Sequence, residues 1–356
     1  MKFTTNKTKF ETVIASMQPF LEKKDSSSIT SHIYIEITNN NLIIKATDYE
    51  MGLQAKIDTI NNIEDGKATV NGSNLLNIIR RLKNEDINFD VQNNFLHITQ
   101  NKSSFKLPMY DANEYPNFPE QNNLNQLDIN TVNLINSIKK ITPAIDNNNP
   151  KFELNGSLID IKEDKINFVA TDTRRLAVSS LPNMSNKPMD IIIPKKAIIE
   201  MQKLFFDQTQ ISYDEVNLVL SNNNYTFFTK LINGKFPDYN RIIPTNLKYN
   251  FTVSKSILIE AIKLITSLKP NIKITFSSTN ILFESVDEDS EAKTQIDINL
   301  NLPESFYIAV NSKYLLDFLS STDNENITIG FNASNLPFYL EDGKFMTIIM
   351  PIILDK

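Results

Sequence analysis

Cysteine is absent from the 356-residue chain, which excludes disulfides and thiolate metal sites. Glycine is scarce, with 7 residues, and no stretch has the spacing of a phosphate-binding loop or a dinucleotide-binding fingerprint. The two histidines, His32 and His97, stand far apart, and neither belongs to a metal-ligand or triad-like pattern. We therefore predict no catalytic residue, no metal site and no cofactor.

Long hydrophobic runs are also missing. No apolar stretch approaches the roughly 20 residues that a membrane-spanning helix needs, and the first residues turn polar at once, without the apolar core of a signal segment. We expect a cytoplasmic protein with no membrane association. With 41% hydrophobic and 22% charged residues, the chain can bury two or three domain cores. The net charge of −6 argues mildly against a protein that coats nucleic acid.

One pattern occurs three times with a constant offset of 124 residues. Each copy is a short strand-like segment, a Thr, Ser or Asn cap and an apolar helix of 3–4 periodicity. The copies begin at Phe3, Leu127 and Phe251. The same register three times indicates a repeated domain.

Later landmarks repeat in the same order. Alternating strands close on the turn aspartates Asp48, Asp172 and Asp287, a second helix follows each, and hairpin turns are expected near Asn93, Asn223 and Gly343. The sequence thus predicts an α+β protein of three repeated domains, with two helices on antiparallel sheets in each. The predicted domains are residues 1–120, 121–244 and 245–356. Ancient duplication without functional content would explain the repeat equally well.

Positive charge is concentrated on the six expected helices. They span residues 5–17, 73–84, 130–141, 195–204, 254–269 and 312–320, and together carry ten more Lys and Arg than Asp and Glu. The remaining residues therefore carry a net charge of −16. Such a helical layer suits non-specific contact with DNA phosphates. The alternative is that Lys is simply a good helix former.

Several segments resemble the bacterial sliding clamps, the beta-subunit family of DNA polymerase III. The resemblance covers essentially the whole chain, and its specific parts are Phe168-Val-Ala-Thr-Asp-Thr-Arg-Arg-Leu-Ala-Val178 and Gly234-Lys-Phe-Pro-Asp-Tyr-Asn-Arg-Ile-Ile-Pro244. Further matches begin at Met1, Ala46 and Ile348, of which the short match at Met1 is weak by itself. The family implies a three-domain clamp protomer and a head-to-tail homodimer that closes into a ring around duplex DNA. It also implies partners, namely the polymerase III alpha subunit, the clamp loader and other clamp-motif proteins.

The resemblance implies two sets of site residues. A hydrophobic pocket between domains 2 and 3 would bind partner peptides through Leu154, Thr171, Thr173, Arg174, Arg175, Leu176, Pro237, Arg241, Ile242, Asn311, Tyr314, Pro337, Ile348, Met350, Pro351 and Ile352. By family position, DNA would contact Lys24, Asn148, Lys151 and Lys196, and the helix charge adds Arg80. Without the resemblance, residues 348–353 would be interpreted as a plain buried strand.

The chain departs from the family pattern at two places. Ile353 stands where many relatives have Arg, and the chain continues through Leu354-Asp355-Lys356. Glu153 stands where the family commonly has an aromatic residue on the DNA side. These departures bear on the pocket rim and on one local DNA contact.

Two other functions compete with a non-catalytic clamp. A carboxylate-based hydrolase could use Asp48 and Asp172, although turn stabilisation explains recurring aspartates more simply. A scaffold without nucleic acid would need the repeats but no positive inner surface. The location of the charge and the closure of an oligomer distinguish the scaffold from the clamp.

Overall fold

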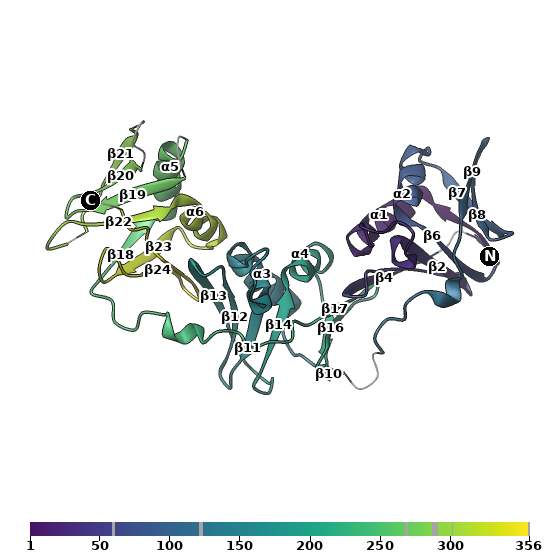
Figure 1. Ribbon diagram of the computed structural model, residues 1–356, viewed down its shortest axis with the longest axis horizontal. Coiled ribbons are helices and arrows are strands. Elements are labelled where there is room, and N and C mark those ends of the chain that lie inside the picture. The colour runs from purple at the N-terminus through teal and green to yellow at the C-terminus, as the bar shows by residue number, and fades with distance from the viewer. Residues whose placement is uncertain (59–60, 121–123, 268–269, 287–290, 301, 355–356) are drawn as a thin grey trace. The chain divides into compact units, whose positions relative to one another are not determined.

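The computed structural model describes the chain except for residues 59–60, 121–123, 268–269, 287–290, 301 and 355–356. Its elements fall into two compact units, Met1–Thr131 with Lys203–Leu231 and Val132–Gln202 with Ile232–Lys356 (Figure 1). Both units combine helices with antiparallel sheets, which confirms the α+β class. Of the helices in the described residues, none has the length and apolar character needed to span a bilayer.

The first unit holds two antiparallel sheets and the helix pair α1 and α2, which pack against each other. The sheets have the orders β5-β1-β7-β8-β9 and β10-β15-β16-β17-β4-β3-β2-β6. The elements are β1 Lys2–Asn6, α1 Lys7–Met17, β2 His32–Thr38, β3 Asn41–Thr47, β4 Met51–Asp58, β5 Asn61–Glu64, β6 Gly66–Asn71, α2 Gly72–Arg81, β7 Asp86–Gln92, β8 Phe95–Gln100, β9 Ser103–Pro108, β10 Asn125–Gln126, β15 Gln210–Tyr213, β16 Asn217–Ser221 and β17 Tyr225–Lys230.

The second unit has the sheet orders β14-β11-β12-β13-β25-β24-β23-β18 and β21-β20-β19-β22. Its helices are α3 Thr131–Ile141, α4 Lys195–Leu204, α5 Lys255–Ile265 and α6 Ser312–Ser321, of which α3 and α4 extend one or two residues beyond the unit. Its strands are β11 Gly156–Ile161, β12 Lys165–Thr171, β13 Arg175–Pro182, β14 Met189–Pro194, β18 Tyr249–Ser254, β19 Asn271–Phe276, β20 Asn280–Ser285, β21 Lys293–Asp297, β22 Phe306–Asn311, β23 Asn326–Phe331, β24 Phe338–Asp342 and β25 Phe345–Ile349. Short 3-10 turns include η4 Thr142–Ala144, η5 Phe152–Asn155 and η6 Tyr239–Arg241.

Capping and periodicity explain the helices. The side chain of Asn6 accepts a hydrogen bond from the Lys9 amide and so begins α1. Phe10, Ile14 and Met17 then follow at helical spacing and are fully buried. The other helices likewise bury one apolar stripe each, for example Leu258, Ala261, Ile262 and Ile265 in α5.

The repeated order of elements is confirmed. Each copy contains a helix, further strands, a second helix and a closing set of strands. The hairpin turns lie at the predicted positions, between β7 and β8, between β16 and β17, and between β24 and β25. Asn93, Asn94 and Gly343 adopt positive φ angles of 51°, 61° and 61° there, a conformation that Asn and Gly tolerate better than other residues.

Two helices end three and four residues earlier than expected, so these two limits were wrong. The helix expected over residues 73–84 ends at Arg81, because Leu82 is extended with φ −73° and ψ 155°, so Lys83 lies beyond it. The helix expected over 254–269 ends at Ile265, and residues 268–269 lie outside the described residues.

Strands from neighbouring copies join into shared sheets. β17 pairs with β4, with Phe227 opposite Leu53, and β25 pairs with β13, with Ile348 opposite Leu176. As a result, β15, β16 and β17 of the second copy belong to the first compact unit. The domain limits near residues 121 and 245 stay a prediction, and residues 121–123 lie outside the described part of the chain.

Candidate functional site

The turn before β13 is built by hydrogen bonds from its own sequence. Asp172 Oδ1 accepts from the amides of Arg174 and Arg175, both at 3.0 Å, while the Thr171 hydroxyl donates to the Arg175 carbonyl at 2.6 Å. Thr173 takes the left-handed conformation that this turn requires, with φ 70°. Backbone geometry therefore fixes the direction in which β13 leaves the turn.

The turn before β4 has the same hydrogen bonds. Asp48 accepts from the amides of Glu50 and Met51, and Tyr49 has φ 69°. The recurring aspartates thus act as turn formers, as the simpler interpretation held. Asp287 lies outside the described residues.

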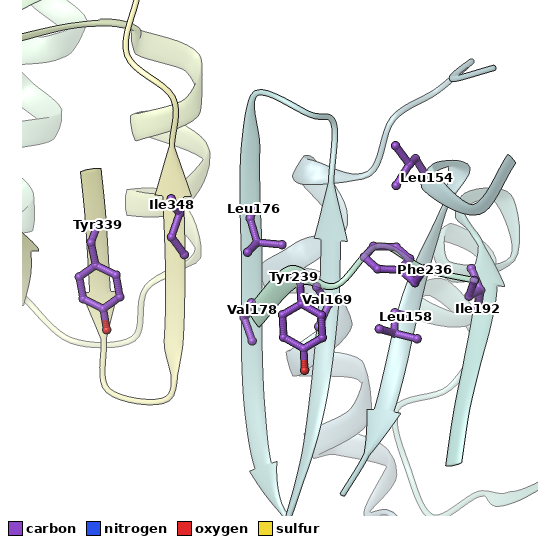
Figure 2. Packing of buried hydrophobic residues seen from close by; sticks show 10 residues of the cluster. All are labelled: Leu154, Leu158, Val169, Leu176, Val178, Ile192, Phe236, Tyr239, Tyr339 and Ile348. Atoms are coloured by element: carbon purple, nitrogen blue, oxygen red, sulfur yellow. The ribbon is translucent and has the colours of Figure 1, made fainter. Parts of the chain in front are cut away.

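A cluster of buried side chains lies at the junction of β13 with β25. Figure 2 shows Leu176 and Val178 on β13 facing the same region as Val169 and Leu158 on the neighbouring strands. One backbone bond extends the junction beyond the strands, since the Met350 amide donates to the Arg174 carbonyl at 2.8 Å. A second bond, from the Ile352 amide to the Ala309 carbonyl at 2.7 Å, holds the segment after β25 to β22 within the third copy. The cluster therefore packs the third copy of the repeat against those strands of the second copy that belong to the second unit.

A pocket of about 460 Å³ opens beside this cluster. Apolar side chains dominate its wall, and three of them keep much of their surface exposed: Met350 at 42%, Ile242 at 43% and Leu336 at 46%. Its lining consists of Thr171, Thr173, Arg175, Leu176, Arg241, Ile242, Pro244, Asn332, Leu336, Pro337, Ile348 and Met350. A concave apolar wall with a few polar groups is typical of a ligand site, and Met adapts to ligands of different shape.

Arg175 forms the buried polar corner of the pocket. Its Nε lies 3.0 Å from Oδ2 of Asp172 and its Nη1 2.7 Å from Oδ2 of Asp317 on α6. Nη2 donates to the Pro143 carbonyl, and the guanidinium lies 4.5 Å from the centre of the Tyr314 ring. The charge of Arg175 is thus balanced by carboxylates inside the protein.

Burial, with the nearby Asp172 carboxylate, raises the pKa of Tyr314 above its usual range. The phenol therefore stays neutral, so the face of its ring remains available to the guanidinium of Arg175.

Nine of the sixteen residues predicted for the pocket line it, and seven do not. The nine are Thr171, Thr173, Arg175, Leu176, Arg241, Ile242, Pro337, Ile348 and Met350. Leu154 is buried in the cluster below, Asn311 caps α6, and Tyr314 packs on Arg175. The remaining four border it in sequence: Arg174 and Pro237 are exposed, and Pro351 and Ile352 follow Met350.

Sequence reasoning missed three lining residues, Pro244, Asn332 and Leu336. Pro244 ends a segment that the resemblance had already marked. Asn332 and Leu336 lie in the loop between β23 and β24, which has no periodic pattern that could have indicated them.

Three models of the DNA polymerase III beta subunit match consecutive parts of the sequence. The N-terminal domain matches residues 1–119, the central domain residues 128–238 and the C-terminal domain residues 240–353. The chain belongs to this family. The three copies of the repeat are therefore clamp domains. The family consists of non-catalytic processivity subunits of the polymerase holoenzyme.

Individual clamps resemble the chain along its full length. The beta sliding clamp of Helicobacter pylori is 37% identical, and the match covers 99% of this chain and 100% of the relative. The crystal structure of the Helicobacter pylori beta clamp bound to a DNA ligase peptide has a TM-score of 0.94, with 37% identity and the same coverage. The DNA polymerase III beta subunit from Pseudomonas aeruginosa shares the fold, with a TM-score of 0.91 at 24% identity, over 99% of this chain and 100% of that structure.

In the first unit, the residues predicted to contact DNA are exposed on separate elements. Lys24 lies in the loop after α1, where its amide donates to Glu22 Oε1 at 2.6 Å. Arg80 lies in the last turn of α2. Both side chains are free to meet solvent or a polyanion.

In the second unit, Lys195 holds together two segments that are predicted to contact DNA. Its Nζ donates to the Ile145 carbonyl and to Asn147 Oδ1, both at 2.7 Å, so the start of α4 adjoins the loop that contains Asn148. Burial lowers the pKa of Lys195, and the Asp146 carboxylate opposes that shift. Lys196 and Asn148 are exposed on either side of this contact.

The loop around Lys151 contains an exposed aromatic residue that sequence comparison had not singled out. Lys151 is exposed, and Phe152 beside it keeps 75% of its surface accessible. Glu153, which occupies the position that is commonly aromatic in the family, is half-buried. An aromatic side chain is thus present one residue earlier.

The excess of positive charge on the helices persists within their observed limits. The helices α1 to α6 carry eight more Lys and Arg than Asp and Glu, while the whole chain has a net charge of −6. The excess is smaller than expected because Lys83 lies after α2 and residue 269 lies outside the described residues.

Proposed function

We propose that the chain is a sliding clamp: a homodimeric ring that encircles duplex DNA and tethers polymerases and other proteins through the pocket beside β13 and β25. The observation that carries this function is the pocket itself. The chain belongs to the same family as the Helicobacter pylori beta clamp, which binds a DNA ligase peptide. This relationship supports a peptide as the ligand of the pocket. The sixteen residues predicted from the resemblance remain the proposed contact set.

The pocket suits a short peptide with apolar anchors. Leu176, Ile348 and Met350 offer an apolar floor, while Thr173 and Asn332 offer polar groups at the wall. Because Arg175 is neutralised by its own carboxylates, the floor does not require a charged ligand. A Gln-Leu-x-Leu-Phe-type peptide combines Leu and Phe anchors with an amide that can meet the polar groups.

Strand pairing supports a head-to-tail dimer. In two of the three copies, the third strand after the first helix accepts the last strand of the next copy, giving the pairs β4 with β17 and β13 with β25. The equivalent strands left over are β21 and β9. In the described part of the chain each is at the edge of its sheet, and an edge strand offers unpaired backbone groups. Pairing β9 of one protomer with β21 of its partner would repeat the same junction and close a ring.

The α5 helix supplies an apolar surface for the same contact. Ile257 and Leu264 lie seven residues apart, hence on one face, with 45% and 60% of their surfaces exposed. At the β25–β13 junction the second helix of one copy, α6, reaches the preceding copy through the Asp317 ion pair with Arg175. If the contact between protomers follows the same arrangement, the second helix of the partner's first copy, α2, would cover the exposed face of α5.

DNA contact would be electrostatic and independent of sequence. Lys24, Arg80, Lys151 and Lys196 supply positive charge, and Asn148 a polar contact. Lys and Arg contacts to phosphate hold a duplex without reading its bases, and salt weakens them. The ring prevents dissociation while these weak contacts permit sliding.

The proposed partners are the polymerase III alpha subunit, the clamp loader and other clamp-motif proteins, in the cytoplasm. A closed ring must be opened before it can encircle DNA, and a separate ATP-driven loader would supply that energy. The chain itself would make and break no covalent bond.

Oligomeric state tests the ring. Light scattering after gel filtration is expected to give twice the chain mass of 40.7 kDa. Leu264→Asp is expected to give monomers, because it places a charge in the proposed interface. Phe206→Asp, at a residue of similar exposure (63%), should remain dimeric. A monomeric wild-type chain would contradict the closed dimer.

A further inference from the structure

The hydroxyl of Tyr239 closes a row of polar side chains across three strands. Asp160, Asn167 and Ser180 are neighbours on β11, β12 and β13. Ser180 donates to Asn167 Oδ1 at 2.8 Å, and Asn167 Nδ2 donates to the Tyr239 hydroxyl at 2.9 Å. The hydroxyl in turn donates to Asp160 Oδ2 at 2.7 Å. The row thus ends on a side chain from a different segment of the chain.

This row is buried, so water cannot readily replace the hydrogen bonds between its side chains. Asp160, Asn167 and Tyr239 each keep 5% of their surface or less. Lys162 contacts the other Asp160 oxygen at 2.9 Å, which leaves Oδ2 for Tyr239. Burial, followed by the bond to Asp160, raises the pKa of Tyr239, so the hydroxyl keeps the proton that it donates.

Tyr239 begins η6, the turn that leads into one wall of the pocket. Arg241 and Ile242, two and three residues later, both line that pocket. The turn lies in a stretch without regular structure between β17 and β18. Among the described residues, the two bonds of the Tyr239 hydroxyl are the only hydrogen bonds that tie residues 233–247 to the sheet.

The polar row and the pocket lie on the same face of one sheet. Side chains two residues apart in a strand share a face, so Asn167, Val169 and Thr171 mark successive steps from the row to the pocket. Figure 2 shows the Tyr239 ring over Val169 between Val178 and Leu158, on the middle step. The Tyr239 ring packs against these apolar side chains, and its hydroxyl attaches the η6 turn to the sheet through hydrogen bonds.

We propose that Tyr239 is a positioning residue, which holds the η6 wall of the pocket in its binding conformation through its hydrogen bond to Asp160. The inference rests on the proposed peptide-binding function of that pocket. An anchored wall is pre-organised, so less conformational freedom is lost when a peptide binds. Tyr239→Phe would keep the ring packed but release the wall.

Fluorescence polarisation with a labelled Gln-Leu-Ser-Leu-Phe peptide tests this on the full chain. Tyr239→Phe is expected to raise the peptide Kd about threefold to tenfold. The corresponding loss of binding free energy is smaller than the contribution that one hydrogen bond to a charged group makes to stability. Asp160→Asn keeps an acceptor oxygen and should bind within about twofold of wild type. Tyr339→Phe, a matched loss of hydroxyl in the same cluster but on β24, should leave the Kd unchanged.

A double-mutant cycle separates positioning from general destabilisation. In an Ile242→Ala background, where the wall has lost its apolar contact, Tyr239→Phe is expected to have no further effect on the Kd. If Tyr239→Phe raised the Kd by the same factor in the Ile242→Ala background as in the wild-type chain, the inference would be overturned. The same holds if Tyr339→Phe raised the Kd as much as Tyr239→Phe does. A Kd for Tyr239→Phe equal to that of wild type would also overturn it.

Hydrogen exchange gives a readout that does not depend on the peptide. The Ile242 amide donates to the Tyr239 carbonyl at 3.1 Å, and its exchange should accelerate in Tyr239→Phe and not in Tyr339→Phe. Unchanged exchange would also count against the inference. Absence of peptide binding by the wild-type chain would overturn the proposed function and this inference together, whereas binding without an effect of Tyr239→Phe overturns this inference alone.

Discussion

Nη1 of Arg175 lies 2.7 Å from Oδ2 of Asp317, which joins β13 to α6 across 142 positions of the chain. The same guanidinium contacts Asp172 in the turn before β13. One side chain therefore holds together three elements of the pocket: the turn, the strand and the helix from the following copy.

Arg175→Ala is expected to destabilise the second unit. Arg175 is 6% exposed, and its loss removes the cation beside Asp172 and leaves Asp317 with the exposed Lys313 alone. Losing one partner of a fully buried ion pair costs 3–5 kcal/mol in general; because water reaches both carboxylates here, we expect about 2 kcal/mol. The midpoint of urea denaturation measures this. Arg174→Ala, at the exposed neighbour, should shift the midpoint little, and equal midpoints for the two variants would contradict the role of Arg175.

Gly52→Ala tests the packing of the first unit. A Cβ at residue 52 would press into the Phe228 ring and lie 2.9 Å from Cζ of Phe118, in the strand where β4 meets β17. We expect a loss of about 1–3 kcal/mol, because the two rings already pack on each other at 4.9 Å and have little room to move. Thermal unfolding measures the change. Gly234→Ala is the control, since its Cβ would meet no atom closer than 3.5 Å.

Glu325 links acid stability to the start of α5. Hydrogen bonds from the Ser254 and Ser256 hydroxyls and from the Ser256 amide lower the pKa of Glu325 to about 2. A carboxylate with a depressed pKa stabilises the folded state above its unfolded pKa, and that contribution is lost as the pH falls toward 2. NMR titration should place the Glu325 midpoint near 2, and Ser256→Ala should move it upward. A midpoint near 4.5 in the wild-type chain would contradict these hydrogen bonds.

Local patterns predicted the local structure well. The apolar spacing of Phe10, Ile14 and Met17 marked α1, and the Asn-rich turns marked the hairpins. The end of α2 was wrong because the chain becomes extended at Leu82, and Lys83 and Asn84 after it carry no helix-breaking signal.

Long-range pairing was beyond the reach of such patterns. The shared sheets depend on β25 meeting β13 and on β17 meeting β4, which no local sequence encodes. Asn332 and Leu336 reach the pocket only because of that pairing, so periodicity could not reveal them. The resemblance found nine of the lining residues because it carries tertiary information that a single sequence does not display.

Peptide binding to the pocket tests the central claim most directly. A labelled Gln-Leu-Ser-Leu-Phe peptide, followed by fluorescence polarisation, is expected to bind the wild-type chain saturably. Met350→Ala, which removes a lining side chain, should weaken that binding strongly, and Pro351→Ser tests the adjoining position. Met184→Ala, at a methionine that is 85% exposed and does not line the pocket, should bind as wild type does. No saturable binding by a folded wild-type chain, or equal binding by Met350→Ala, would contradict a clamp that tethers its partners through this pocket.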